Sequence, residues 1–143
     1  LGVAAIRRNP SSPTTHHKTC SYLDNAMVRE EAKGQGFDEA ILLNPSGELC
    51  EGSCTNLFFV QAGMLHTPAP ECGLLRGILR AKVLERAKAL GIPCQEGRYP
   101  LERLRQADEI FVTNSLLHVM PVSWFEGLER NPQRPLTSRL AES

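Results

Sequence analysis

Residues 37–60 read FDEAILLNPSGELCEGSCTNLFFV and hold several strand and turn signals in close succession. The runs at 37–44 and 55–60 are apolar and typical of strands, whereas NPSG at 44–47 has the composition of a tight turn. ELCEG after that turn is short enough to be a returning strand. Together with MLHT after Gly63, these segments predict an antiparallel meander.

A helical pattern replaces the strand pattern further along the chain. Between residues 75 and 90, apolar side chains recur every four positions, at Leu75, Leu79, Val83 and Ala87. The charged residues of this stretch lie largely on other faces, which predicts an amphipathic helix that ends at Gly91.

The remaining segments complete the predicted fold class. We expect a strand at 3–6, a helix at 22–33 with Ser21 as its N-cap, and a buried strand at 108–114. VMPVSWF is expected as an edge or bulged strand because it contains Pro121. PLTSRLAE is expected to be a closing helix. The class is therefore α+β: mainly antiparallel strands with helices packed against them, in one domain spanning residues 1–143.

The composition excludes several classes of function. The 143 residues include 16 basic and 16 acidic side chains, so bulk charge does not favour binding to nucleic acid. No apolar run is long enough to cross a bilayer, and no signal peptide is evident. The five cysteines are irregularly spaced, which indicates reduced thiols and a cytoplasmic protein. His16, His17 and Cys20 have no second cluster at ligand spacing, so no metal site is expected.

Two residues are candidates for chemistry. Lys18 is the only one of the four lysines that lies in a loop ahead of a predicted helix. The partial positive charge of that helix end disfavours a second cation, which suits a lysine that must react as a neutral amine. Glu51 follows the 44–47 turn and precedes small residues. A solvated surface lysine and a strand-end glutamate are the plainer interpretations.

Two further segments contain groups able to bind a ligand. ECGLLRGILR, residues 71–80, begins the predicted amphipathic helix with Gly73 and Gly77, and the free N–H groups of its first turn are suited to a phosphate. TNS, residues 113–115, ends a strand with three hydrogen-bonding side chains. An ordinary helix entry and a plain turn are the alternatives.

In this order and spacing, the segments resemble one family over nearly all of the chain. HHKTCSYLDN, FDEAILLNPSGELCEGSCTNLFFV, HTPAPECGLLRGILR and ADEIFVTNSLLHVMPV are similar to the class IV, fold-type IV enzymes that use pyridoxal phosphate. These are the branched-chain and D-amino acid aminotransferases and 4-amino-4-deoxychorismate lyase. The combination of EGSCTNLFFV with GLLRGILR downstream is specific to this family.

The resemblance implies a role for each candidate at the cofactor pyridoxal 5'-phosphate. Lys18 matches the lysine that bonds covalently to it, and Glu51 the carboxylate that keeps its pyridine nitrogen protonated. Tyr22 is similar to a tyrosine that, in some members, hydrogen-bonds the phenolic oxygen of the ring. The phosphate and cofactor contacts are matched by Ile78, Leu79, Asn114 and Ser115. Many members have Thr where this chain has Leu79, so only a backbone contact is expected there.

The resemblance also implies an architecture and a set of possible functions. The chain is similar to the larger C-terminal domain of the family, a barrel-like antiparallel sheet with flanking helices, and lacks the smaller N-terminal domain that supplies an arginine for the phosphate. A homodimer acting on a small amino substrate is implied. TNSLLHVMPV and GILR favour 4-amino-4-deoxychorismate lyase, which releases pyruvate and 4-aminobenzoate for folate synthesis. The alternatives are a branched-chain or D-amino acid aminotransferase and an inactive half-protein that serves as an interaction module.

Overall fold

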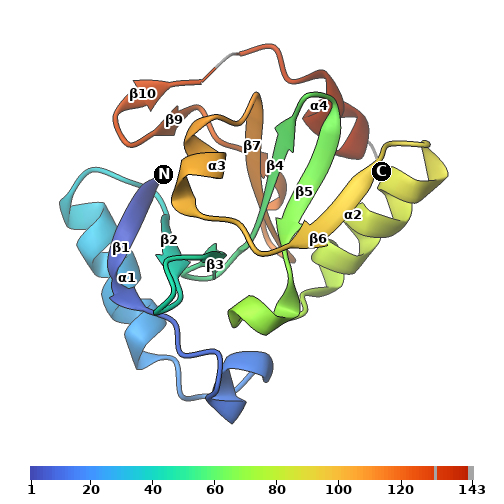
Figure 1. Ribbon diagram of the computed structural model, residues 1–143. Helices are drawn as coiled ribbons and strands as arrows, with labels where there is room; N and C mark the ends of the chain where they lie inside the picture. The colour runs from blue at the N-terminus through green and yellow to red at the C-terminus, as the bar shows by residue number, and fades with distance from the viewer. Residues whose placement is uncertain (131, 142–143) are drawn as a thin grey trace.

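A single large sheet contains the meander predicted from residues 37–60 (Figure 1). The computed structural model describes residues 1–130 and 132–141. The strands of this sheet are β1 (Gly2–Arg7), β2 (Ala40–Leu43), β3 (Leu49–Gly52), β4 (Asn56–Gln61), β5 (Met64–Pro68), β6 (Cys94–Gly97), β7 (Glu109–Asn114) and β8 (His118–Pro121). They are ordered β1-β2-β3-β4-β5-β6, and β7 pairs with β4 and with β8.

Most of the pairings are antiparallel, as expected. Only β1 with β2 and β5 with β6 run parallel among the pairings of the described residues. The α+β class is therefore confirmed. The sheet remains open, since β1, β6 and β8 each have one partner strand within the part of the chain that the structure describes, so its likeness to a barrel is only approximate.

The helices lie on different sides of the sheet. They are α1 (Leu23–Gly34), α2 (Ile78–Ala89), α3 (Leu101–Arg105) and α4 (Pro135–Ala141), with short 3₁₀ turns η1 (Pro13–His16) and η2 (Pro70–Cys72). Helix α1 contacts β1 and β2, whereas α2 and α4 contact β7 and each other (Figure 1). The helix predicted at 135–142 is confirmed up to residue 141, and residue 142 lies outside the described residues.

The starts of two helices differ from the sequence-based expectation. Tyr22 is the N-cap of α1 in place of Ser21, and no side chain caps that helix. Helix α2 begins at Ile78 and not at residue 75, because Gly77 has an extended conformation with φ −68° and ψ 148°. Residues 74–77 therefore have no regular secondary structure and lead into α2.

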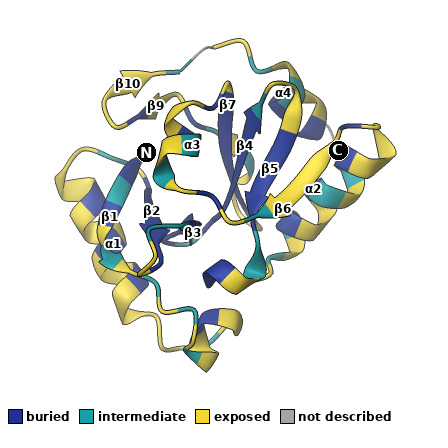
Figure 2. Ribbon diagram, in the orientation of Figure 1, coloured by how far each residue is buried: buried dark blue, intermediate teal, exposed yellow. Residues whose placement is uncertain are grey.

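Strand β4 is buried on both of its faces, which explains its unbroken apolar sequence (Figure 2). Leu57 and Phe59 pack into one cluster of core residues, whereas Phe58 and Val60 pack into a second cluster beneath α2 and α4. The rings of Phe58 and Phe111 stack with their centroids 5.0 Å apart. This double packing fixes β4, and β3 beside it, at the centre of the molecule.

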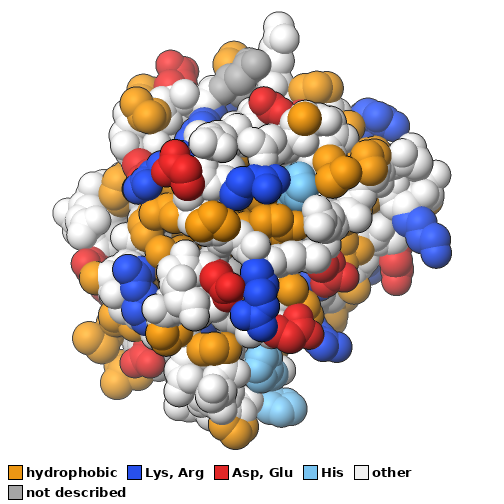
Figure 3. Space-filling model, viewed as in Figure 1, with side chains coloured by type: hydrophobic (Ala, Val, Ile, Leu, Met, Phe, Trp, Pro, Cys, Tyr) orange, Lys and Arg blue, Asp and Glu red, His pale blue; other side chains and the backbone are white. Residues whose placement is uncertain are grey.

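The segment after β8 is divided more finely than predicted. Strand β8 ends at Pro121 on the open side of β7, and a separate hairpin of β9 (Trp124–Phe125) and β10 (Leu128–Glu129) follows. On the face in Figure 3, acidic and basic side chains are interspersed, as the balanced composition implies. Among the described residues, no helix combines the length and apolar character needed to cross a membrane.

Candidate active site

Glu51 lies on β3 as a buried carboxylate with two kinds of partner. Its side chain sits between β1 and the segment that enters α2, and the residue is only 5% exposed. Atom Oε1 is 3.0 Å from Arg8 Nη2, and Oε2 accepts a hydrogen bond from the Leu75 N–H at 3.0 Å. The alternative of a solvated strand-end glutamate is therefore wrong.

Burial dominates the ionisation of Glu51. It raises the pKa of this carboxyl group to about 7, although Arg8 and the Leu75 N–H favour the charged form. The free-energy cost of removing the carboxylate from water is larger than the stabilisation that these two partners provide. Near neutral pH both protonation states of Glu51 are thus populated. A protonated ligand nitrogen bound beside it would favour the anionic carboxylate.

Arg8 is the residue of this site that sequence reasoning missed. It follows β1 directly, and its Nη1 donates to Asn25 Oδ1 at 2.8 Å. Asn25 in turn donates from Nδ2 to the Ser53 carbonyl at 2.7 Å, so α1 and the loop after Glu51 are joined through one side chain. The only signal in the sequence was an arginine pair at the end of an apolar strand.

Glu39 holds the loop after Glu51, residues 53–55, through its carboxylate. Its Oε1 accepts a hydrogen bond from the Ser53 N–H at 2.9 Å, and its Oε2 accepts one from Thr55 Oγ1 at 3.0 Å. Gly52 packs so closely here that an added Cβ would collide with Thr55 Oγ1 and lie 2.9 Å from the Glu39 carboxylate. The turn from β3 to β4 is therefore rigid, and it holds Glu51 at a defined position.

Tyr22 lies close enough to Glu51 for the two groups to interact electrostatically. Burial raises the pKa of the Tyr22 phenol, and the negative charge of Glu51 raises it further. The side chain is still 38% exposed, so it borders solvent at the N-terminus of α1. A phenol that stays protonated is a hydrogen-bond donor for a ligand that lies over Glu51.

Lys18 occupies an exposed loop between η1 and α1, four residues before Tyr22. Within residues 1–130 and 132–141, the structure records no hydrogen bond or ion pair for its amine. Lys33, in contrast, pairs with Glu30 at 2.8 Å. The loop therefore leaves the Lys18 amine without a protein partner, but no recorded contact joins it to Glu51.

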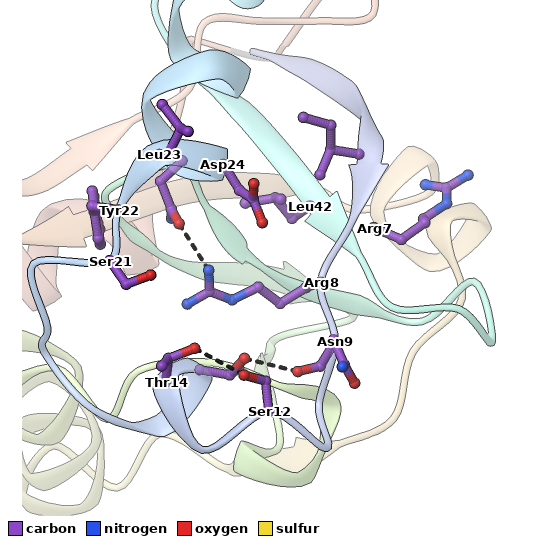
Figure 4. Close-up of a pocket in the computed structure, with 13 residues that line it drawn as sticks. Arg7, Arg8, Asn9, Ser12, Thr14, Ser21, Tyr22, Leu23, Asp24 and Leu42 are labelled. Atoms are coloured by element: carbon purple, nitrogen blue, oxygen red, sulfur yellow. Dashed lines mark hydrogen bonds between the residues drawn. The ribbon is translucent and has the colours of Figure 1, made fainter.

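A cavity of about 260 Å³ lies between the end of β1, the residues of η1 and the start of α1, and Lys18 does not line it. Figure 4 shows the Arg8 side chain extending across it between β1 and α1, with Ser12, Thr14 and Tyr22 around it. Asn25 also lines the cavity. Neither Glu51 nor the start of α2 lines this cavity. Because Arg8 and Tyr22 do line it, the cavity adjoins the Glu51 site without including Glu51 itself.

The start of α2 presents free backbone donors. Gly77 is its N-cap, and no side chain caps the helix. The first backbone bond of the helix runs from the Ala81 N–H to the Gly77 carbonyl at 3.1 Å. The N–H groups of Ile78 and Leu79 precede it and have no intrahelical acceptor. This end of α2 is thus suited to an anionic group, and phosphate binding there stays a prediction.

Asn114 already uses its side chain within the protein. Its Oδ1 accepts hydrogen bonds from the N–H groups of Leu116 and Leu117 at 2.9 and 2.7 Å, and its Nδ2 donates to the Cys54 carbonyl at 3.2 Å. These hydrogen bonds link the turn after β7 to the loop after Glu51. Ser115 is exposed in that turn and has no recorded contact with the other candidates among the described residues.

These residues fit pyridoxal phosphate in their chemistry. A buried carboxylate with a pKa of about 7 suits a pyridine nitrogen that shares its proton, and the uncapped start of α2 suits a phosphate. Residues 74–77 connect these two places directly, since Leu75 touches Glu51. The amine of Lys18 remains for a covalent bond.

The chain is similar to known proteins along most of its length. A family model described as amino-transferase class IV matches residues 1–125. Over 130 residues the chain is 35% identical to a probable branched-chain-amino-acid aminotransferase of Synechocystis, in a match that covers 91% of this chain and 43% of that protein. Over 131 residues it is 34% identical to the aminodeoxychorismate lyase of Bacillus subtilis, with 92% and 45% covered.

The likeness extends to the three-dimensional structure. The branched-chain aminotransferase of the archaeon Thermoproteus uzoniensis, solved with norvaline, matches with a TM-score of 0.94 at 37% sequence identity. The match covers 98% of this chain and 48% of that chain. A branched-chain amino acid aminotransferase solved with pyridoxamine 5'-phosphate matches with a TM-score of 0.90 at 33% identity. This chain therefore spans about half the length of the proteins that it matches.

Proposed function

This chain belongs to the class IV aminotransferase family, and from that membership we propose that it forms the lysine-bearing part of a 4-amino-4-deoxychorismate lyase. The family uses pyridoxal phosphate. The observation that carries the proposal is the buried Glu51 carboxylate, with its raised pKa, beside Tyr22 and the open start of α2.

Each residue has a distinct task in this proposal. When bound, pyridoxal phosphate supplies an electron sink for the carbanion formed at the amine-bearing carbon of the substrate. Glu51 holds the proton on the pyridine nitrogen, and the N–H groups of Ile78 and Leu79 bind the phosphate. Tyr22 donates a hydrogen bond to the phenolic oxygen of the ring.

Lys18 moves the protons of the reaction. Its amine takes the proton from the amine-bearing carbon of 4-amino-4-deoxychorismate. The C–O bond to the enolpyruvyl group then breaks, and the electron pair leaves on that oxygen. Lys18 returns the proton to the leaving group, which becomes pyruvate, and the ring of the remaining product becomes aromatic as 4-aminobenzoate. The atoms of the substrate are conserved in these two products.

The preference for a lyase comes from the sequence around Asn114. The segment TNSLLHVMPV differs from the small and Thr-rich residues that aminotransferases tend to have there, and Leu79 replaces their threonine. An aminotransferase is the second candidate, because the chain is about equally similar to the aminotransferase of Synechocystis and to the lyase of Bacillus subtilis.

One assay separates the two reactions. The longest natural form of the protein that contains this chain is given 4-amino-4-deoxychorismate without a keto acid, and both products are followed over many turnovers. Sustained release of pyruvate and 4-aminobenzoate supports the lyase, because an aminotransferase needs a keto acid to complete each cycle. Amino-group exchange between a branched-chain or D-amino acid and 2-oxoglutarate, without release of pyruvate, would establish the aminotransferase.

A further inference from the structure

Both backbone polar groups of Leu75 are held by side chains of the central sheet. Its N–H donates to Glu51 Oε2 at 3.0 Å, and its carbonyl accepts a hydrogen bond from Asn56 Nδ2 at 2.8 Å. Leu75 belongs to residues 74–77, which have no regular secondary structure. These two side chains therefore replace the backbone partners that a helix or strand would provide.

Glu51 and Asn56 act together because they face each other across the β3–β4 pairing. Asn56 Nδ2 lies 3.5 Å from Glu51 Oε2, at the limit of a hydrogen bond. Asn56 is only 7% exposed, and its other neighbour in the sheet is Thr113 of β7. The amide is thus anchored between two strands and has little freedom to move.

Asn56 also touches the residue from which α2 begins. The Gly77 N–H donates to the Leu75 carbonyl at 2.9 Å, the same oxygen that Asn56 holds. A Cβ added to Gly77 would collide with Asn56 Oδ1. The amide group therefore binds the chain just before α2 through its nitrogen and packs against the N-cap of α2 through its oxygen.

We propose that Asn56 is a positioning residue that fixes the separation between the Glu51 carboxylate and the first-turn N–H groups of α2. This inference rests on the proposed function, in which opposite ends of pyridoxal phosphate bind at those two places. The pyridine nitrogen and the phosphate belong to one small ligand whose dimensions are fixed by its bonds. If α2 shifts relative to Glu51, the ligand cannot bind both the carboxylate and the first-turn N–H groups of α2 at good distances.

The test compares pyridoxal phosphate with pyridoxal, which lacks the phosphate. The dissociation constant of each is measured by absorbance titration for the natural protein and for Asn56→Leu. The ratio of the constant for pyridoxal to that for pyridoxal phosphate reports how much the phosphate contributes to binding. Leu has the branched shape of Asn but holds neither the Leu75 carbonyl nor Glu51, so we expect this ratio to fall about tenfold.

Thr67→Val is the matched control. Thr67 is also buried in the sheet, and its Oγ1 donates to the Leu57 carbonyl at 2.8 Å, but it touches neither Glu51 nor the start of α2. Its loss weakens the fold in a comparable way and should leave the ratio unchanged. A ratio that falls equally in both variants would overturn the positioning role, because general destabilisation would then explain it.

The outcomes separate the inference from the function on which it rests. If the natural protein binds pyridoxal phosphate better than pyridoxal, and Asn56→Leu keeps the same ratio, the role of Asn56 is refuted and the proposed function stands. If the natural protein binds neither ligand, the proposed function fails and the inference fails with it. Should Asn56→Leu not fold, Asn56→Ala serves instead, since its methyl group cannot donate to the Leu75 carbonyl; an unchanged ratio there is equally decisive against the role.

Discussion

Replacing Glu51 by Gln should make the stability of the protein less sensitive to pH. In the folded, cofactor-free protein, burial raises the pKa of Glu51 to about 7, whereas 4.5 is its ordinary value. Between these two pH values the folded state binds a proton at Glu51 that the unfolded state has already released. The free energy of unfolding therefore decreases as the pH rises through this window.

The size of the effect follows from the two pKa values. A folded-state pKa of about 7 against 4.5 corresponds to a loss of about 3 kcal/mol between pH 4 and pH 8. Glutamine does not titrate, so the free energy of unfolding of Glu51→Gln does not decrease in this way. Arg8 pairs with the ionised carboxylate, and its attraction is already contained in the pKa of about 7, so the loss of this pair adds no further pH dependence. From pH 4 to pH 8, the free energy of unfolding of the variant should therefore rise by about 3 kcal/mol relative to that of the natural protein.

Urea unfolding of the cofactor-free protein at intervals from pH 4 to pH 8 measures this difference. Glu85→Gln is the matched control, because Glu85 is an exposed residue of α2. Its difference from the natural protein should stay nearly constant with pH. If the Glu51→Gln difference is equally flat, the carboxyl group does not have a raised pKa, and the account of a poised, buried Glu51 is refuted.

Three further predictions concern the other residues of the site. Borohydride reduction in the presence of pyridoxal phosphate should attach it to Lys18, as peptide mass spectrometry would show, and labelling of another lysine instead would contradict the assignment. Tyr22→Phe should weaken binding of pyridoxal phosphate by about tenfold through the loss of one hydrogen bond, and an unchanged dissociation constant would remove Tyr22 from the site. Glu39→Gln should lower the free energy of unfolding by roughly 2–3 kcal/mol, because an amide cannot accept all the donors of the Ser53–Thr55 turn. A decrease below about 0.5 kcal/mol in urea unfolding would show that the turn holds without this carboxylate.

Local sequence patterns were sufficient for most of the secondary structure. The turn at 44–47, the helix over most of residues 75–90 and the buried strand at 108–114 are all present, because turn residues and apolar periodicity act over a few neighbouring positions. The errors lie at the starts of α1 and α2 and in the segment after β8, which was expected as part of one strand. Nothing in the periodicity shows that Gly77 is extended or that Asn56 of β4 packs against it, because that contact joins residues far apart in the sequence.

The sequence by itself also determined which residue types stand at the candidate site, since EGSCTNLFFV and GLLRGILR identify Glu51 and the start of α2. Only the tertiary structure decided their environment. It buries Glu51, brings Arg8 from the end of β1 against it, and places Leu75 between Glu51 and Asn56. The physical reason is that a pKa and a fixed separation depend on which distant segments exclude water and hydrogen-bond together, and no local pattern contains that information.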